Sequence, residues 1–146
     1  MAHDEALLDL IAGTNEAALA IVKSDGYPHL SNVYYLWDPA ERTALISTKA
    51  DRVKGRVLRR DPRAALYVRG AHFFAWAVGE GDAELSDVTT SPGDATAQEL
   101  LPIYEMLGET GDLDALFARM IEEQRLAIRL RVKRVYGMAL PADPRA

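Results

Sequence analysis

Hydroxyl and basic side chains are concentrated in the segment 46–56, Ile-Ser-Thr-Lys-Ala-Asp-Arg-Val-Lys-Gly-Arg. A strand that ends in hydroxyl side chains and leads into a basic turn and helix start brings hydroxyl donors, backbone N–H groups and cations together. A phosphate group requires that set of donors. The segment is not a standard phosphate motif such as the P-loop, so a solvated basic helix face is the alternative explanation. The candidate phosphate-binding residues are Ser47, Thr48, Lys49, Arg52, Lys54 and Arg56.

Charge is unevenly distributed along the chain. The 17 Lys and Arg residues and 22 Asp and Glu residues give a formal net charge of −5, which argues against a general nucleic-acid-binding protein. Residues 49–63 nevertheless carry a local net charge of +5, which leaves −10 for the rest of the chain. An acidic protein with one basic segment indicates a compact anionic ligand.

Polar and aromatic residues alternate in the segment 28–35, which we expect to form a strand. Ser31 and Asn32 need hydrogen-bond partners if they are buried there, and the edge of a planar heterocycle would supply them. Ordinary cross-strand pairing on a half-exposed sheet is the alternative. Phe74 and Trp76 share one face of a later strand, where they could line a ring-binding pocket, a subunit interface or the core.

The sequence lacks the residues of several common catalytic centres. Cysteine is absent, which excludes disulfides and thiolate catalysis. His3, His29 and His72 do not have the spacing of metal ligands, so we expect no metal site. There is no Gly-x-Ser-x-Gly motif and no clear acid–base set, which leaves redox chemistry to a bound cofactor. Catalytic residues stay unassigned, and Tyr34 and Tyr35 are candidate proton donors only because one lies on each strand face.

The first residues of the sequence are acidic, and Asp9 interrupts their apolar run, so this segment does not have the pattern of a signal peptide. No apolar run approaches the roughly 20 residues that cross a bilayer. We expect a cytoplasmic protein that binds neither membranes nor nucleic acids.

Hydrophobic periodicity predicts the elements that must position these residues. In the strand 73–85, small residues occupy one side, which predicts close backbone approach inside a barrel or at a bend. In the last strand, Arg129, Arg131 and Lys133 form one face, which is either solvated or binds an anionic tail or a partner's carboxylates. The predicted strands are 17–22, 30–37, 43–48, 64–68, 73–85 and 126–133, and the predicted helices are 4–11, 52–60, 100–107 and 113–121.

These elements predict an α+β fold with an antiparallel, barrel-like sheet of about six strands. Helices are inserted late in the chain, and most strands are joined by short turns. No internal repeat or linker divides the sequence, so we expect residues 1–146 to form a single domain.

Four segments together resemble a known superfamily. They are residues 25–33 (Asp-Gly-Tyr-Pro-His-Leu-Ser-Asn-Val), the basic block 52–64, the turn Glu80-Gly81-x-Ala83 and the ending Arg134-Val135-Tyr136-Gly137. The sequence resembles the pyridoxamine 5′-phosphate oxidase-like split β-barrel superfamily, and within it the actinobacterial flavin/deazaflavin oxidoreductases of the B group. The resemblance covers essentially the full length. It implies a six-stranded antiparallel split β-barrel with short peripheral helices.

The resemblance also implies a cofactor and a partner. It implies a homodimer with two sites at the subunit interface, each holding the deazaflavin coenzyme F-420 or, in other relatives, FMN. Ser47, Arg52, Lys54 and Arg56 match the residues that bind the phosphate or phospholactyl group. Ser31 and Asn32 match the strand beside the flavin-like ring, and Phe74 falls where the family presents an aromatic residue from the partner subunit. Thr48 and Lys49 are added on chemical grounds alone.

The expected activity is that of an F-420-dependent reductase that transfers a hydride to a small planar unsaturated acceptor. An FMN-binding oxidoreductase is the first alternative, and a non-catalytic carrier of a cofactor, haem or another tetrapyrrole is the second. The chain departs from many relatives at Arg56-Val57-Leu58, where they have Arg-Asn-Leu. Its short end, 140–144, lacks the substrate residues of the pyridoxine phosphate oxidases, which disfavours vitamin B6 oxidation.

Overall fold

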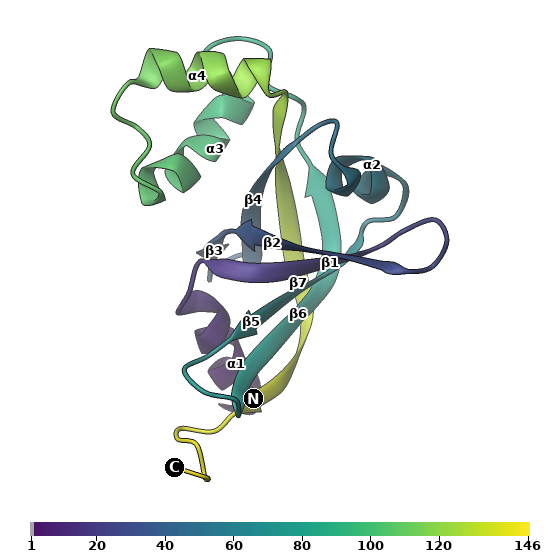
Figure 1. Cartoon of the computed structure of the whole chain (residues 1–146), viewed down its shortest axis with the longest axis vertical. Helices are drawn as coiled ribbons and strands as arrows, with labels where there is room; N and C mark the ends of the chain where they lie inside the picture. Colours follow the sequence, from purple (N-terminus) through teal and green to yellow (C-terminus); the bar gives the residue numbers. More distant parts are fainter. Residues whose placement is uncertain (1) are drawn as a thin grey trace.

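The computed structural model describes residues 2–146 and has one antiparallel sheet with four short helices (Figure 1). The strand order across the sheet is β2-β1-β5-β6-β7-β4-β3. The sheet curls into an open barrel, which confirms the predicted α+β split-barrel class. In chain order the elements are α1 (Ala2–Ala12), β1 (Glu16–Val22), β2 (Pro28–Tyr34), β3 (Leu36–Asp38), β4 (Thr43–Lys49), α2 (Val53–Arg60), β5 (Arg63–Arg69), β6 (Ala75–Leu85), α3 (Ala95–Met106), α4 (Leu113–Glu122) and β7 (Arg125–Ala139).

The sheet has seven strands where six were predicted, because the run 30–37 is divided at Tyr35. β2 pairs with β1, whereas β3 pairs with β4 at the opposite edge of the sheet. Tyr35 is fully buried, its backbone N–H donates to the carbonyl of Asn15, and its hydroxyl donates to the carbonyl of Ile11 near the end of α1. These bonds direct the chain out of β2, so one continuous run supplies both edge strands.

The small residues of the predicted strand 73–85 lie where β6 and β7 approach closely. A Cβ atom at Gly81 would lie 1.8 Å from the carbonyl oxygen of Arg131, and one at Gly79 would lie 2.9 Å from a methyl of Val132. The register between the two strands shifts directly before Gly81. The prediction of close backbone approach at a bend is therefore confirmed.

β7 is longer than the predicted 126–133 because its second half also pairs with β6. The pairing extends to Ala139, which lies opposite Ala75 at the start of β6. Its first half pairs with β4, from Lys49 opposite Arg125 onward. β7 thus joins the two halves of the sheet.

Apolar side chains fill the barrel and a separate space beneath α3 and α4. The barrel core includes Leu7 and Ile11 of α1, so the predicted N-terminal helix closes one end of the barrel. The second cluster packs Leu100 of α3 and Met120 of α4 against Ala127 of β7. α3 and α4 lie at the end of the molecule opposite both termini (Figure 1).

α3 begins earlier than the predicted residue 100 because Asp94 caps it. The Asp94 carboxylate accepts hydrogen bonds from the backbone N–H of Ala97 at 3.0 Å and of Thr90 at 2.8 Å, and from the hydroxyl of Thr89 at 2.7 Å. Such a cap satisfies amide groups that the first helical turn leaves without partners. The apolar periodicity alone did not reveal this first turn, because its residues 95–98 include no large apolar side chain.

Candidate functional site

A cavity of about 410 Å³ collects most of the predicted phosphate-binding residues, and we call it the anion cavity. Its walls come from β2, β4, α2, α3 and the first residue of β7, which are far apart in the sequence. Predicted residues that line it are Asn32, Ser47, Thr48, Lys49, Arg52 and Lys54. Tyr34, Tyr104, Glu109 and Arg125 also line it, beside the apolar Val33, Ile103 and Leu107.

Lys54 is one of the partly buried cations of the anion cavity. Its Nζ donates a hydrogen bond to Ser31 Oγ at 3.3 Å, which joins α2 to β2 and brings Ser31 to the site. Among residues 2–146 no carboxylate forms an ion pair with this ammonium. Burial, together with the charges of Arg52 and Arg125, lowers the pKa of Lys54. An anion in the cavity would relieve this like-charge repulsion.

The start of α2 adds favourable backbone electrostatics. Arg52 is the N-cap residue, yet its side chain makes no capping hydrogen bond, and no acidic residue occupies the first turn. Free amide groups and the positive end of the helix dipole favour an anion at such a position. The local sequence therefore leaves the positive end of the helix uncompensated beside Lys54.

A shared carboxylate holds the other two cations in place. Glu123 follows α4 and lies 3.6 Å from Lys49 Nζ and 3.2 Å from Arg125 Nε. Lys49 and Arg125 are also cross-strand neighbours in β4 and β7. Burial alone would raise the pKa of Glu123, but Arg125 and Lys49 lower it. One carboxylate between two cations leaves this wall of the cavity positive.

Tyr104 connects the helical end of the molecule to β4. Its hydroxyl lies 3.3 Å from Ser47 Oγ, and the side chain is almost completely buried. The guanidinium of Arg119 lies over the Tyr104 ring at 5.9 Å from the centroid and pairs with Glu109 at 3.1 Å. Residues of α3 and of the following loop thus complete the lining of the cavity.

Three predicted residues take other positions or other faces. Arg56 is exposed and donates to the carbonyl of Asp51 at 2.6 Å, outside the cavity lining. Phe74 lies before β6, where its ring packs edge-on against Phe73, far in the chain from the residues of the anion cavity. Thr48 lines the cavity but is only 3% exposed, because neighbouring residues of β4 alternate between the two faces of the sheet and Thr48 lies on the buried face, opposite to Ser47.

Tyr104 and Arg125 were missed because they follow the other site residues by about 50 residues or more. Arg125 is in phase with the basic face of the last strand, so extending that strand by one residue would have found it. Tyr104 lies in a helix whose apolar periodicity explained it as a core residue. Only the packing of α3 against β4 reveals its contact with Ser47.

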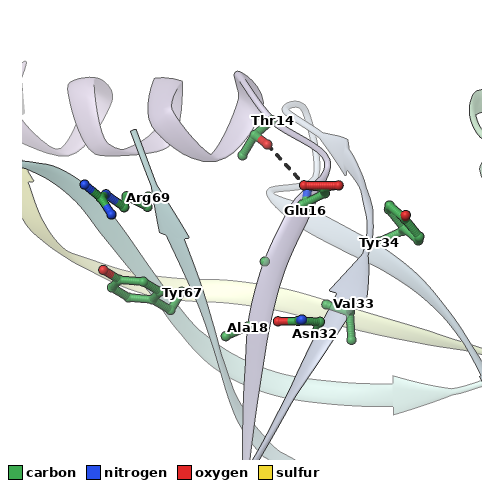
Figure 2. Close-up of a pocket in the computed structure, with 9 residues that line it drawn as sticks. Thr14, Glu16, Ala18, Asn32, Val33, Tyr34, Tyr67 and Arg69 are labelled. Atoms are coloured by element: carbon green, nitrogen blue, oxygen red, sulfur yellow. Dashed lines mark hydrogen bonds between the residues drawn. The ribbon is translucent and has the colours of Figure 1, made fainter. Parts of the chain in front are cut away.

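A second hollow, which we call the outer cavity, lies next to the anion cavity, and Figure 2 shows its lining residues. It has a volume of about 530 Å³ and shares Asn32, Val33 and Tyr34 with the anion cavity. Tyr67 and Arg69 of β5 form its other wall. The C-terminal end of β2 therefore separates one space rich in cations from another lined by two tyrosines.

The two candidate proton donors differ in their surroundings. The hydroxyl of Tyr35 is bonded to the carbonyl of Ile11, and burial raises the pKa of Tyr35. Tyr34 is 48% exposed and lines both cavities. Of the two, only Tyr34 has its side chain at the site.

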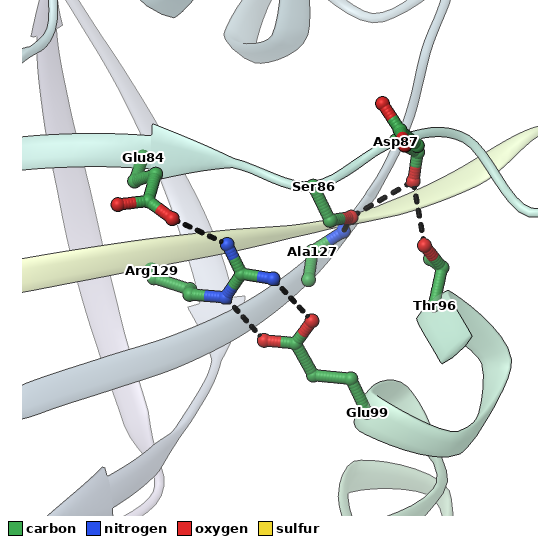
Figure 3. A network of polar contacts seen from close by, with 7 residues as sticks. All are labelled: Glu84, Ser86, Asp87, Thr96, Glu99, Ala127 and Arg129. Atoms are coloured by element: carbon green, nitrogen blue, oxygen red, sulfur yellow. Dashed lines mark hydrogen bonds and ion pairs between the residues drawn. The ribbon is translucent and has the colours of Figure 1, made fainter.

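A polar network fixes α3 on the sheet (Figure 3). Arg129 donates two hydrogen bonds to Glu99 of α3 and one, at 2.7 Å, to Glu84 of β6. The bond with Glu99 raises the pKa of Arg129. At the start of the helix, the hydroxyl of Thr96 donates to the carbonyl of Asp87 at 2.8 Å. Because α3 carries Tyr104, this network helps to position one wall of the anion cavity.

The basic face predicted for the last strand is neutralised within the chain. Arg129 is bound by the two glutamates of this network, Arg131 pairs with Glu41 at 3.2 Å, and Lys133 pairs with Asp82 at 2.7 Å. The sequence left two alternatives for this face, a solvated face or binding of an anionic tail or a partner's carboxylates. In the structure its cations have carboxylate partners from the same chain, and Arg131 and Lys133 remain exposed.

Two kinds of feature are absent from residues 2–146. No helix there is long and apolar enough to cross a membrane. No group of three or more His, Asp or Glu side chains in that range is placed to hold a metal ion.

A curled antiparallel sheet with an anion cavity beside its edge strand β2 is the arrangement of the split β-barrel class. The sequence profile of the family described as pyridoxamine 5′-phosphate oxidase matches residues 3–139, and the chain belongs to this family. The family includes oxidoreductases and binds flavin-type cofactors.

Solved structures share the fold. A conserved hypothetical protein of Mycobacterium tuberculosis superposes with a TM-score of 0.72 at 22% identity, covering 96% of this chain and 89% of that one. An F-420 reductase has a TM-score of 0.67 at 22% identity, covering 88% and 94%. A haem-binding protein of Mycobacterium smegmatis has a TM-score of 0.61 at 25% identity, covering 95% of this chain and 55% of that one. These likenesses establish the architecture.

Proposed function

We propose that this protein is a coenzyme F-420-dependent reductase whose anion cavity binds the phosphate of the coenzyme. The observation that carries the proposal is the convergence of four cations, Lys49, Arg52, Lys54 and Arg125, on one cavity. Of the nearby carboxylates, Glu123 is shared by Lys49 and Arg125, and Glu109 is paired with Arg119. Cations in such excess favour an anionic ligand.

The donors present fit a phosphate group followed by a flat ring. Lys54 and Arg52 would hold the phosphate, assisted by the hydroxyls of Ser31 and Ser47. Asn32 lines both cavities, so its amide can orient a ring edge by hydrogen bonds. When bound, the reduced deazaflavin supplies a hydride for an unsaturated acceptor. The protein contributes orientation, exclusion of water and charge stabilisation.

FMN is the alternative cofactor because its terminal phosphate presents the same chemistry to the same cations. An F-420 reductase is among the structural neighbours that share this fold, at 22% identity, and for that reason we place the deazaflavin before FMN. The haem-binding neighbour keeps a carrier as a further alternative, since haem carboxylates could pair with the cations. Direct binding experiments separate the three ligands.

A homodimer is part of the proposal. The outward face of β2, β6 and β7 carries large apolar or aromatic side chains that are exposed or only partly buried, including Leu30, Trp76, Tyr136 and Met138. The Trp76 ring contacts both Tyr67 and Tyr136, with centroids 6.1 Å apart in each pair. Exposed apolar patches of this kind mark protein interfaces. Sedimentation of the purified protein would test this, with Tyr136→Glu expected to shift the protein to monomers.

The test of the proposed function is a parallel titration of the purified protein with F-420, FMN and haemin, followed by tryptophan fluorescence and by absorbance. We expect F-420 to bind most tightly. Lys54→Ala should weaken F-420 binding by roughly tenfold or more, because a hydrogen bond to a charged group contributes about 1.5–3 kcal/mol.

Arg59→Ala is the matched control, because Arg59 is an exposed cation of the same helix that does not line the anion cavity. Its affinity for F-420 should stay within about twofold of the wild type. Unchanged affinity in Lys54→Ala would refute the phosphate assignment. Tighter binding of FMN would identify a flavin enzyme, and binding of haemin without turnover of any acceptor would identify a carrier.

A further inference from the structure

The outer cavity carries polar groups that the proposed phosphate contacts do not use. Its lining combines the aromatic rings of Tyr34 and Tyr67 with the guanidinium of Arg69 and the carboxylate of Glu16 (Figure 2). The volume of about 530 Å³ lies within the range of small-molecule sites. Flat walls and one cation are suited to a flat anionic molecule.

Arg69 differs from the other arginines on the same face of the sheet. Arg63 pairs with Asp61 at 2.7 Å, and Arg134 pairs with Glu80 at 3.5 Å. Within residues 2–146, no carboxylate lies at ion-pair distance from Arg69, although its side chain lines the cavity. An arginine can bind a carboxylate through two parallel hydrogen bonds, which gives both strength and direction.

The ring of Tyr67 packs against a second aromatic ring, that of Trp76. Its centroid lies 6.1 Å from that of Trp76 at an interplanar angle of 31°, so the neighbouring indole restricts the ring. Tyr67 nevertheless remains 44% exposed on the cavity side. A planar conjugated molecule can stack on such a ring at little entropic cost to the protein.

Glu16 limits the charge of the ligand. It lines the outer cavity from β1, and no ion pair joins it to Arg69 in the described part of the chain. A second anionic group near Glu16 would be repelled, whereas a hydroxyl or amino group could donate a hydrogen bond to it. The cavity therefore suits one carboxylate at the Arg69 end and a neutral polar group at the other.

The position of the outer cavity connects it to the proposed cofactor site. Asn32, Val33 and Tyr34 line both cavities, so molecules in the two spaces would lie on either side of the same strand end. We propose that the outer cavity is the acceptor site and takes a flat aromatic or conjugated molecule with a single carboxylate, which Arg69 binds. The assignment as acceptor rests on the proposed function, whereas the binding chemistry can be tested without it.

The test measures binding of 2-naphthoate and of its neutral analogue 2-naphthamide to the full chain by calorimetry. Arg69→Gln should weaken 2-naphthoate binding about tenfold or more and leave 2-naphthamide within about twofold. Tyr67→Leu should weaken both compounds, because stacking does not depend on the charge. Arg59→Gln serves as the charge-matched control and should change neither.

Inorganic phosphate is titrated in the same preparations. Arg69→Gln should leave phosphate affinity unchanged, and Lys54→Ala should reduce it while preserving 2-naphthoate binding. No binding of 2-naphthoate to the wild type, or an equal loss of both naphthalene compounds in Arg69→Gln, would overturn the carboxylate site. Failure of phosphate to bind the wild type would instead count against the proposed function, so the two failures are distinguishable.

Discussion

Two groups of basic residues in this protein have similar composition and opposite surroundings. Arg129, Arg131 and Lys133 on β7 are each paired with carboxylates of the same chain. At the anion cavity, Arg52 and Lys54 have no such partner in the described chain, and Lys49 shares Glu123 with Arg125. Cations that lack internal partners are available to a ligand, whereas paired cations hold elements together. Whether a cation has a carboxylate partner within the chain therefore distinguishes a binding role from a structural one, and the sequence pattern does not show this.

The largest difference that we expect between the two groups of cations is in their contribution to the stability of the fold. Arg129→Met removes three hydrogen bonds to Glu99 and Glu84, so we expect the free energy of unfolding to fall by about 1–3 kcal/mol. Lys54→Met should change it by less than about 0.5 kcal/mol, because burial and neighbouring cations already disfavour its charge. Urea denaturation measures both. Equal losses in the two variants would show that the cavity cations also maintain the fold.

The next effect is a pH dependence of anion binding. Because the pKa of Lys54 is lowered, this ammonium loses its charge at a lower pH than an ordinary lysine. Phenyl phosphate is a suitable ligand because its second ionisation, at about pH 6, is complete above about pH 8. Its affinity for the protein should fall several-fold as the pH rises above that value. Lys54→Arg should retain its affinity, since guanidinium stays charged. Parallel profiles for the two proteins would exclude Lys54 as the titrating group.

A smaller effect is expected at the cap of α3. Asp94→Ala should lower the free energy of unfolding by about 1 kcal/mol. Burial would raise the pKa of Asp94, but hydrogen bonds from Thr90, Ala97 and Thr89 lower it to about 2. Its contribution is therefore complete above the ordinary carboxyl range and is lost as the pH falls toward about 2. Denaturation at several pH values should show wild type and variant converging in acid.

Asp112→Ala is the matched control for that cap. Asp112 begins α4 and accepts a hydrogen bond from the backbone N–H of Ala115 at 3.1 Å, its single capping contact in the described structure. Its loss should cost less than the loss of Asp94. The reverse order would mean that the additional bonds of Asp94 do not contribute to stability.

The smallest effect is expected for an exposed pair on β7. Lys133 and Asp82 lie 2.7 Å apart, but their side chains are 61% and 50% exposed. Lys133→Met should change the free energy of unfolding by no more than about 0.5 kcal/mol, because water and salt screen such pairs. Thermal unfolding at low and high salt would test this. A loss as large as that of Arg129→Met would mean that the whole row acts as one network.

Local patterns predicted the order and type of nearly all elements. Alternation and turn chemistry identified β1, β4 and β5, and the small residues of β6 indicated the bend near Gly81. The break at Tyr35 escaped prediction because its cause is a hydrogen bond to the distant Ile11. In the same way, β7 was cut short because pairing with β6, not alternation, sustains its second half.

The site, like the fold, could be predicted where its residues are close in the sequence and not where distant segments pack together. Residues 31–54 contain the hydroxyls and most of the cations within one short stretch, so their chemistry could be seen in the sequence. Tyr104, Arg125 and Glu123 reach the cavity only through the packing of α3, α4 and β7. The role of Phe74 depends on a partner subunit, and it stays a prediction.

The division of one run into β2 and β3 also bears on aggregation. Edge strands present unpaired backbone groups that can recruit strands from other molecules. Here the two edge strands are consecutive in the chain, and Tyr35 alone separates them. At that end of the barrel the edges are covalently joined, and Tyr35 anchors their junction to α1. β2 also begins at Pro28 and β3 ends at Asp38, a proline and a charged residue of the kinds that discourage strand addition at a sheet edge.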